Sequence, residues 1–394
     1  MGGMRPRLSR KLTGFGTTIF TEMTRLANER GAINLAQGFP DFDGPEWLKD
    51  AAVAAIREKP NQYARMTGVP PLNAALSRKY DRDYSLQYDG DAEITVTSGA
   101  TEAIFATLQG LLDVGDEVVL FEPYYDSYRA SVYMAGAIPR VATLHPPGPG
   151  ETEWTFDRDA VRALFGPRTR VLLLNSPHNP TGKVFSRDEL TFLAGLCEEH
   201  DVVCLSDEVY EHLVYESVHI PMATLPGMRA RTVTLSSLGK TFSFTGWKIG
   251  WACAPPDLTA AVRSAHQFVT FATATPLQYA AVAAVDAGPD YYRELTADFR
   301  QKRDLLVEEL ARIGFDVTPP AGTYFACAGF GRFVDGPPDD LAFVRRLIDL
   351  GVAAIPPSVF YDHPEHGRSY VRFAFCKREE TLRAAVARLE ALRV

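Results

Sequence analysis

The sequence predicts an α/β protein: a mostly parallel β-sheet covered by helices, with a smaller α+β unit after it. Three observations lead to this fold class. Between residues 45 and 286, apolar runs of strand length alternate with longer amphipathic stretches. Several of these runs are apolar at consecutive positions, which is typical of strands buried on both faces. After Gly288 and Pro289 the pattern changes to a long charged helix followed by short strands.

The candidate strands of the large sheet are spaced far enough apart to be joined by helices. Parallel strands need such crossover connections, since a tight hairpin would reverse the chain direction. The six candidates are Ile94–Thr97, Val118–Phe121, Val171–Leu174, Val202–Leu205, Thr232–Leu235 and Gly250–Ala254.

The two ends of the chain complete the predicted organisation. Residues 1–18 read as an arm, and Ile19–Asn28 fits a short helix. Beyond residue 287 we expect helices over about 291–313, 338–350 and 378–392, with strands at Tyr324–Ala328 and Tyr370–Phe375. We therefore divide the chain into an N-terminal arm with part of the small domain (1–46), a large domain (47–287) and a small C-terminal domain (288–394).

Composition excludes several classes of protein. With 46% hydrophobic and 23% charged residues the chain is not disordered, and its net charge of −8 disfavours nucleic-acid binding. The five cysteines form no C-x-x-C pair, which argues against a disulfide framework or a zinc ribbon. We find no signal peptide and no apolar run long enough to span a membrane, so we expect a cytoplasmic protein.

Polar residues follow four of the predicted strands. In an open α/β sheet, ligands bind beyond the carboxyl ends of the strands, so these segments are expected to share one pocket. Any one of them could instead cap a helix, as Ser98 could. The four segments are Ser98–Glu102, Asn175–Gly182, Ser206–Tyr210 and Ser236–Lys240.

Lys240 is the most unusual of these residues. It lies among Phe, Trp and Gly residues rather than on a charged surface. A desolvated amine has a lowered pKa and becomes nucleophilic, as a lysine that forms an imine must be. Lys248, between Trp247 and Ile249, could supply a fixed cation for a phosphate. Taken alone, each lysine is more often structural.

The other segments supply complementary chemistry. A helix that starts at Ser98–Thr101 would offer free N–H groups to a phosphate. Asp207 ends a very apolar strand, and one helical turn would bring Tyr210 to its side, although both could be structural. Together, a phosphate cradle, an anion, a phenol and a buried lysine are what pyridoxal 5'-phosphate requires.

The order of these motifs resembles that of class I aminotransferases in the fold type I group of pyridoxal-phosphate enzymes. Such enzymes have a three-layer α/β/α large domain. The resemblance runs from about Phe20 to the C-terminus. Segments 32–42 and 122–128 are most similar to the kynurenine/glutamine-type and methionine aminotransferases, and bacterial N-succinyldiaminopimelate aminotransferases look similar too. The motifs are Gly38-Phe-Pro-Asp-Phe42, Ser98-Gly-Ala-Thr-Glu102, Asn175-x-Pro-x-Asn179-Pro-x-Gly182, Asp207-Glu-Val-Tyr210, Ser237-x-x-Lys240 with Thr245-Gly-Trp-Lys-Ile-Gly250, and Arg372.

The resemblance implies a role for each matching residue. Lys240 would carry the cofactor and shuttle a proton, Asp207 would pair with the pyridine nitrogen, and Tyr210 with Asn179 would bind the phenolic oxygen. The cofactor's ring would stack on Tyr124 in preference to Tyr125. Arg372 would bind the substrate α-carboxylate, helped by Gly38 and Asn175. The phosphate would be held by Gly99, Ala100, Thr101, Ser237 and Lys248, with Tyr63 reaching in from the second subunit of a homodimer.

Two positions depart from the family pattern. Lys248 stands where many relatives carry Arg, and a lysine gives a point charge without a planar fork. Tyr124 stands where close relatives often have Phe, which would still stack. We expect neither metal nor nucleic acid as a partner. His363 and His366 could hold a metal, but a solvated loop is the better interpretation.

The implied reaction is transfer of an amino group from an amino acid to a 2-oxo acid by a ping-pong mechanism. Aromatic candidates near the family's pocket favour a large neutral donor such as methionine, an aromatic amino acid, kynurenine or glutamine; they are Phe15, Phe20, Tyr63, Tyr124, Phe271 and Phe360. Alternatively, Arg65 could read a succinyl carboxylate in an N-succinyldiaminopimelate aminotransferase. Two further functions compete with transamination: a cysteine-conjugate β-lyase and a non-catalytic amino-acid sensor. The short arm leaves no room for the DNA-binding module of a sensor.

Overall fold

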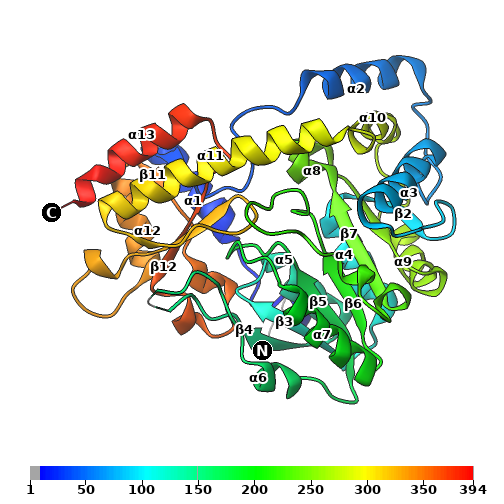
Figure 1. Ribbon diagram of the computed structural model, residues 1–394, viewed down its shortest axis with the longest axis horizontal. Helices are drawn as coiled ribbons and strands as arrows, with labels where there is room; N and C mark the ends of the chain where they lie inside the picture. Colours follow the sequence, from blue (N-terminus) through cyan, green and yellow to red (C-terminus); the bar gives the residue numbers. More distant parts are fainter. Residues whose placement is uncertain (1–8, 149, 394) are drawn as a thin grey trace, which may run out of the picture.

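A seven-stranded sheet forms the centre of the protein. The computed structural model describes residues 9–148 and 150–393, so the first eight residues of the predicted arm lie outside it. The strand order is β2-β8-β7-β6-β5-β3-β4, and only β8 runs antiparallel to its neighbours (Figure 1). The strands are β2 Ile94–Ser98, β3 Glu117–Glu122, β4 Ile138–Thr143, β5 Thr169–Asn175, β6 Val203–Asp207, β7 Thr232–Ser237 and β8 Ile249–Cys253.

Helices cover both faces of this sheet. Along β5, Val171 and Leu173 pack into one core with α4, α5 and α9, whereas Leu172 and Leu174 pack into another with α7. This explains why β5 is apolar at consecutive positions. The helices of this domain are α2 Glu46–Glu58, α3 Pro70–Tyr84, α4 Gly99–Leu111, α5 Asp126–Ala135, α6 Arg158–Arg162, α7 Arg187–Glu199, α8 Leu238–Thr241, α9 Pro256–Val269 and α10 Thr275–Val285.

The edge strand β4 was absent from the sequence prediction. Its residues alternate between exposed and partly buried, and Ile138 is among the exposed large hydrophobic residues. Pro139 also disfavours a strand in sequence reasoning, although an edge strand tolerates proline. The apolar-run criterion therefore found the five inner strands and the buried edge strand β2, and missed the exposed edge strand β4.

The smaller unit contains a second sheet of order β12-β10-β9 and a parallel pair of β1 with β11. The long helix α11 crosses the molecule and links the two units (Figure 1). The predicted boundary at residue 287 falls just before α11. The elements are α1 Ile19–Arg30, β1 Ile33–Asn34, α11 Pro289–Ile313, β9 Asp316–Val317, β10 Phe325–Gly329, α12 Asp340–Asp349, β11 Val352–Ala353, β12 Tyr370–Ala374 and α13 Glu379–Leu389.

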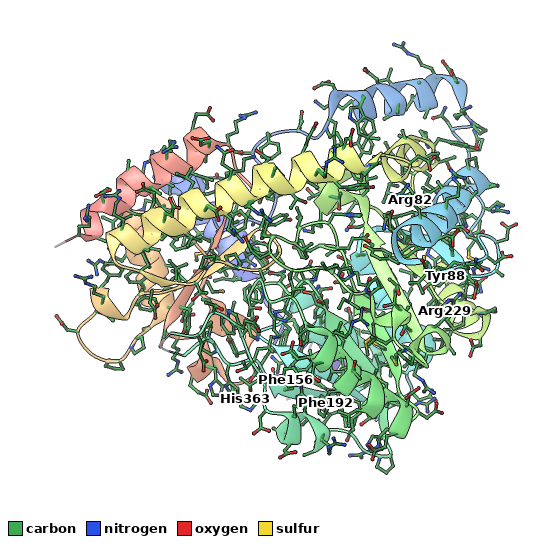
Figure 2. The ribbon with its side chains drawn as sticks, in the orientation of Figure 1. Arg82, Tyr88, Phe156, Phe192, Arg229 and His363 are labelled. Atoms are coloured by element: carbon green, nitrogen blue, oxygen red, sulfur yellow. The ribbon has the colours of Figure 1, made fainter. Side chains whose placement is uncertain are left out.

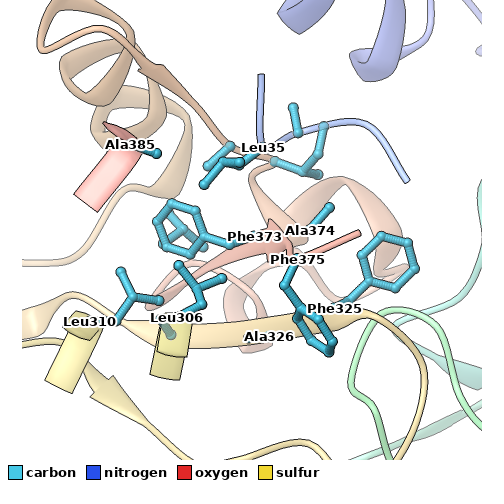
Figure 3. Close-up of a cluster of buried hydrophobic side chains, with 14 of the residues drawn as sticks. Leu35, Leu306, Leu310, Phe325, Ala326, Phe373, Ala374, Phe375 and Ala385 are labelled. Carbon is cyan, nitrogen blue, oxygen red and sulfur yellow. The ribbon is translucent and has the colours of Figure 1, made fainter. Parts of the chain in front are cut away.

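The N-terminal segment belongs structurally to this smaller unit. Leu35 lies in one buried cluster with Leu306 of α11, Phe325 of β10 and Phe373 of β12 (Figure 3). The backbone N–H of Ala374 donates to the Leu35 carbonyl at 2.8 Å. These contacts hold residues 33–36 beside β12, and so bring the Gly38 motif next to Arg372.

Surface side chains tie the outer elements to the sheet. The Arg229 guanidinium lies 4.1 Å from the Tyr88 ring centroid and donates to Glu93, which fastens the loop before β7 to the entry of β2 (Figure 2). Within the described ranges, no helix has the length and apolar character needed to cross a membrane.

Candidate active site

A cavity of about 210 Å³ lies at the carboxyl ends of β5, β6 and β7. It is the place where the sequence predicted one shared pocket, because parallel strands end at the same edge of the sheet. Most of the predicted site residues meet there. The lining comprises Gly99, Ala100, Thr101, Ile104, Tyr125, Tyr128, Asn175, Asn179, Asp207, Val209, Tyr210, Ser237, Gly239, Lys240, Thr245, Lys248 and Ile249.

Lys240 reaches this cavity from α8, the short helix that follows β7. Its amine lies 5.6 Å from the ring centroid of Tyr210 and 5.8 Å from that of Tyr324. It forms no ion pair with any described residue. Burial lowers the pKa of Lys240, and the nearby Arg372 and Lys248 cations lower it further against the opposing influence of Cys376 and Asp207. This environment therefore increases the fraction of Lys240 that is present as the neutral, nucleophilic amine.

Asp207 lies at the last position of β6 and is buried. Burial raises its pKa to about 6, while the Tyr128 hydroxyl, the Val209 N–H and Lys240 oppose the rise. Tyr128 donates its hydroxyl to Asp207 Oδ2 at 2.6 Å. A charged Asp207 is therefore costly here, and a cationic ligand facing it would favour ionisation.

Tyr128 was not predicted as a site residue. It lies one helical turn after Tyr125 on α5, and this spacing was the available signal. The sequence could not show that α5 packs against the end of β6.

Another part of the lining, around Gly99 and Lys248, suits an anion. Gly99 has φ of +76°, a conformation that glycine adopts without strain, and it begins helix α4. The Lys248 amine lies 3.5 Å from where a Gly99 Cβ would be. A helix N-terminus beside a lysine, with Ser237 in the same lining, combines free N–H groups with positive charge.

Arg372 on β12 is buried and has no carboxylate partner among the residues that the structure describes. Its Nη1 donates to Asn179 Oδ1 at 3.0 Å and its Nη2 to the Ala36 carbonyl at 2.8 Å, while Nε has no partner there. Burial lowers the pKa of Arg372 to about 10. A buried cation held only by neutral acceptors is costly, which indicates an anionic ligand.

The two asparagines of the 175–182 segment are held differently. Asn175 uses its side chain on the backbone: Oδ1 accepts from the Asn179 N–H at 2.8 Å, and Nδ2 donates to the Asp207 carbonyl at 2.9 Å. The side-chain oxygen of Asn179 accepts from Arg372, which leaves its NH₂ group for the cavity. Asn175 thus fixes the loop, while Asn179 joins the Arg372 side of the site to the cavity.

The structure corrects the choice between two adjacent tyrosines. Tyr125 lines the cavity and Tyr124 does not. The Tyr124 hydroxyl donates to Asp362 at 2.6 Å and its N–H donates to the Phe360 carbonyl at 3.0 Å, so Tyr124 serves to hold the 357–367 loop. The sequence could not distinguish the two residues, because they are adjacent and have the same neighbours along the chain. The conformation of the turn between β3 and α5 directs Tyr125, rather than Tyr124, into the cavity.

Several other predicted residues lie outside the cavity lining. The ring centroids of Phe20 and Phe360 each lie 5.4 Å from the Arg372 guanidinium carbon, whereas Phe15 packs on Tyr133 of α5. Arg65 pairs with Asp91 at 2.9 Å on the surface.

Tyr63 lies apart from the cavity of its own chain. It is 87% exposed and packs edge-on against Phe271, with 5.7 Å between the ring centroids.

His363 of the 357–367 loop, labelled in Figure 2, makes an ion pair with the buried Glu122 at 2.7 Å. No group of three His, Cys, Asp or Glu residues suited to a metal occurs in 9–148 and 150–393.

The family follows from comparison with known proteins. The family model described as aminotransferase class I and II matches residues 30–389. The chain belongs to this family and is an aminotransferase, which confirms the resemblance and the fold class predicted from the sequence.

Individual relatives cover almost the whole chain. A probable N-succinyldiaminopimelate aminotransferase of Mycobacterium tuberculosis is 44% identical over 97% of this chain and 98% of its own length. The methionine aminotransferase of Escherichia coli is 41% identical over 97% of both chains. The solved structure of the M. tuberculosis N-succinyldiaminopimelate aminotransferase superimposes with a TM-score of 0.94 over 98% of this chain and 100% of that one. Thermus thermophilus aspartate aminotransferase with maleate is 33% identical and superimposes with a TM-score of 0.89 over 99% and 100%.

Proposed function

We propose that the enzyme uses pyridoxal 5'-phosphate, carried by Lys240, to move the amino group of a large neutral amino acid to a 2-oxo acid. One observation carries the proposal. Arg372 is buried, Lys240 is partly buried with a pKa that desolvation lowers, and neither cation forms an ion pair within the described residues. Asn179 connects the Arg372 guanidinium to the cavity that holds Lys240. A substrate with an amine and an α-carboxylate would meet both.

The cavity fits each part of the cofactor. The start of α4, Ser237 and Lys248 suit its phosphate, and Asp207 suits a protonated ring nitrogen. Tyr210 and the NH₂ group of Asn179 suit its phenolic oxygen, and the Tyr125 ring suits its face. When bound, pyridoxal phosphate supplies an aldehyde and a protonated ring that accepts electrons from the substrate.

The residues of the chain supply the remaining chemistry. The Lys240 amine, once free, would act as a general base and remove the proton from the substrate Cα. It would then donate this proton to the cofactor carbon. Its lowered pKa favours the neutral amine that this role needs. Arg372 binds the α-carboxylate with its paired N–H groups, and Phe20 and Phe360 exclude water around that contact.

The surroundings favour a neutral side chain on the donor. Within the described lining of the cavity, the cations are Lys240 and Lys248, and both have roles with the cofactor. Arg65, considered as a reader of a succinyl carboxylate, is engaged with Asp91 and with the Gly68 carbonyl. A distal carboxylate would therefore need a cation from another source.

N-Succinyldiaminopimelate is the second candidate donor. The 44% identity with the M. tuberculosis relative, over nearly the full length of both chains, favours it. It is larger than methionine and carries extra carboxylates, so the two proposals differ in the charge that the donor side chain presents.

We also propose that two copies of the chain form the working enzyme. Tyr63 and Phe268 are 87% and 86% exposed, which is unusual for aromatic side chains. A second copy would cover them and bring Tyr63 toward the phosphate of the neighbouring site. Light scattering should give twice the chain mass. The cytoplasmic location stays a prediction from the sequence.

Absorbance spectroscopy tests the proposed function. The purified protein with pyridoxal phosphate is mixed with methionine, phenylalanine, kynurenine, glutamine or N-succinyldiaminopimelate, one at a time. We expect loss of the cofactor's visible band in the native protein, fastest with a large neutral donor, and no loss in Lys240→Ala.

Each outcome has a defined meaning. Fastest bleaching by N-succinyldiaminopimelate would replace the neutral-donor proposal with the second candidate. Pyruvate release from a cysteine conjugate, without bleaching by any donor, would favour β-lyase chemistry. Failure to take up the cofactor would contradict the proposed site.

A further inference from the structure

Three backbone carbonyls of the 36–39 segment are each held by a buried side chain of the smaller unit. Arg372 donates to the Ala36 carbonyl at 2.8 Å, Tyr324 to the Gly38 carbonyl at 2.6 Å, and Lys377 to the Phe39 carbonyl at 2.7 Å. The segment therefore has a fixed backbone path although it is not part of a helix or strand.

The N–H of Gly38 lies in the middle of this clamped segment. It has no hydrogen-bond acceptor in the described part of the chain, whereas the N–H groups of Ala36 and Gln37 both donate to Asn34 Oδ1. A Cβ at Gly38 would lie 2.5 Å from the Phe325 ring, so only glycine fits here. The same ring lies 4.1 Å from the Arg372 guanidinium. The Gly38 backbone and the Arg372 guanidinium thus lie against the same Phe325 ring.

Tyr324 is held in place from several sides. Its ring lies perpendicular to that of Tyr210, with 5.2 Å between the centroids. The preceding residue, Thr323, has φ of +64°, which is costly for a β-branched residue. The hydroxyl of Tyr215 donates to the Thr323 carbonyl, and the Thr323 N–H donates to the Leu213 carbonyl at 2.8 Å. The surrounding structure thus imposes a strained backbone just where Tyr324 must point at Gly38.

We infer that Tyr324 is a positioning residue for the substrate α-carboxylate and acts through Gly38. Its hydroxyl fixes the Gly38 carbonyl, and this sets the backbone whose free N–H shares the carboxylate with Arg372. Its ring also contacts Tyr210, so the carboxylate subsite and the cofactor subsite are built on one side chain. This inference rests on the proposed function, since it assumes a substrate with an α-carboxylate.

The test compares Tyr324→Phe with the native holoenzyme and with Tyr80→Phe as a matched control. Tyr80 is equally buried and its hydroxyl accepts a hydrogen bond from Trp251, but it lies on α3, away from the cavity. Calorimetry measures binding of 3-phenylpropanoate, an amino-acid analogue without the amine, and of its uncharged amide. Steady-state kinetics then give KM and kcat for several donors and acceptors.

We expect Tyr324→Phe to weaken binding of the carboxylate about tenfold and to leave the amide unaffected, because one hydrogen bond that orders the subsite is lost. KM should rise by a similar factor for every substrate, with kcat and cofactor affinity nearly unchanged. Unchanged carboxylate binding, or equal losses of carboxylate, amide and cofactor affinity, would overturn the inference. Failure of the proposed function would look different: the native protein itself would bind the carboxylate without transferring an amino group.

Discussion

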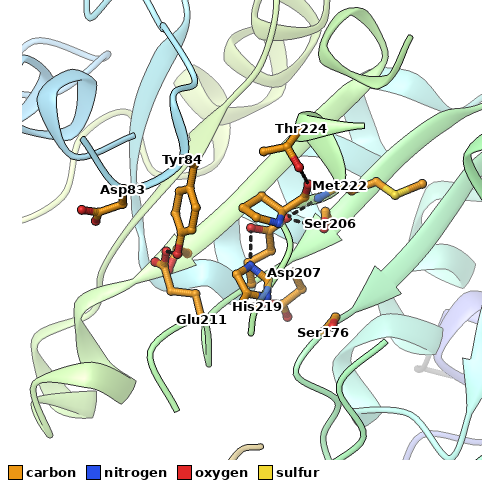
Figure 4. A network of polar contacts seen from close by, with 12 residues as sticks. Asp83, Tyr84, Ser176, Ser206, Asp207, Glu211, His219, Met222 and Thr224 are labelled. Atoms are coloured by element: carbon orange, nitrogen blue, oxygen red, sulfur yellow. Dashed lines mark hydrogen bonds and ion pairs between the residues drawn. The ribbon is translucent and has the colours of Figure 1, made fainter. Parts of the chain in front are cut away.

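The segment 207–211 presents buried polar groups to two sides of the protein, and the two sides are treated differently. Asp207 and Tyr210 line the cavity together with Lys240, and Asn179 links this cavity to Arg372; neither cation forms an ion pair with a described residue. Glu211 instead contacts Tyr84 of α3 (Figure 4), and Glu208 contacts His219; neither residue lines the cavity. There the charges are closely paired, which indicates a structural role.

Glu211 shows how complete this pairing is. It accepts from Lys79 and from the Tyr84 hydroxyl, each at 2.6 Å, and from the Ser236 hydroxyl at 2.9 Å. Burial alone would raise the pKa of Glu211, but the nearby Lys79 and the hydrogen bonds hold it well below its usual range. Buried charge is tolerated here because every carboxylate oxygen has a donor.

Glu208 repeats the arrangement. It pairs with His219 at 2.9 Å, and the Ser206 hydroxyl donates to its other oxygen at 2.7 Å. The comparison teaches that burial of charge does not by itself mark an active site. The distinguishing feature is a buried charge that lacks its partner within the protein.

Removal of Lys240 should give the largest effect. It tests most directly whether the charges without a protein partner belong to the active site. In Lys240→Ala we expect the single-turnover rate of donor deamination to fall by about 10²- to 10⁴-fold, because the proposed general base is lost. The unfolding midpoint of the apoprotein should be unchanged or higher, since a desolvated amine without an ion-pair partner among the described residues has been removed. Exposed Lys59, replaced in the same way, is the control. A rate within tenfold of the native value would show that Lys240 is structural.

Removal of Lys79 should have the opposite signature. Lys79→Met leaves Glu211 buried without its cation, and we expect a loss of about 3–5 kcal/mol in the free energy of unfolding, measured in urea. The double variant Lys79→Met with Glu211→Gln should recover part of this loss. Because neither residue lines the cavity, kcat/KM of the folded protein should change only a few-fold. A large loss of activity with full stability would contradict the structural assignment.

Replacement of Asp207 should give a smaller effect, one that depends on pH. Its pKa is about 6 in the folded protein against 3.8 ordinarily, so ionisation destabilises the folded apoprotein as pH rises from about 4 to 6. Asp207→Asn should therefore stabilise the apoprotein by about 1–3 kcal/mol at pH 7 and by almost nothing at pH 4. Unfolding at both pH values measures this.

The same variant should bind pyridoxal phosphate more weakly, because the partner of the ring nitrogen is gone. Tyr128→Phe is the control: it keeps the carboxylate and removes one hydrogen bond to it. A pH-independent gain in Asp207→Asn would show that desolvation of the carboxylate is not the cause.

Sequence reasoning brought the right residues to one cavity wherever chemistry and local pattern agree. Lys240, Asp207 and Asn179 each lie at or just after the carboxyl end of a buried strand, and parallel strands bring these ends together whatever the details of packing. The aminotransferase family was predicted correctly for the same reason, since its motifs occur in order along the chain. The edge strand β4 was missed because its exposure removes the continuous apolar signal.

Other features depend on contacts between segments far apart in the chain. The spacing of residues does not reveal that Tyr128 binds Asp207, that Tyr125 rather than Tyr124 faces the cavity, or that Tyr324 holds Gly38. Glu208 and Glu211 have the same charge as Asp207 and lie within four residues of it. The sequence by itself determined the fold class and the family and predicted which residues gather at the cavity, because these follow from periodicity and motif order. Only the tertiary structure decided which buried charges are paired, because a charge finds its partner in three dimensions.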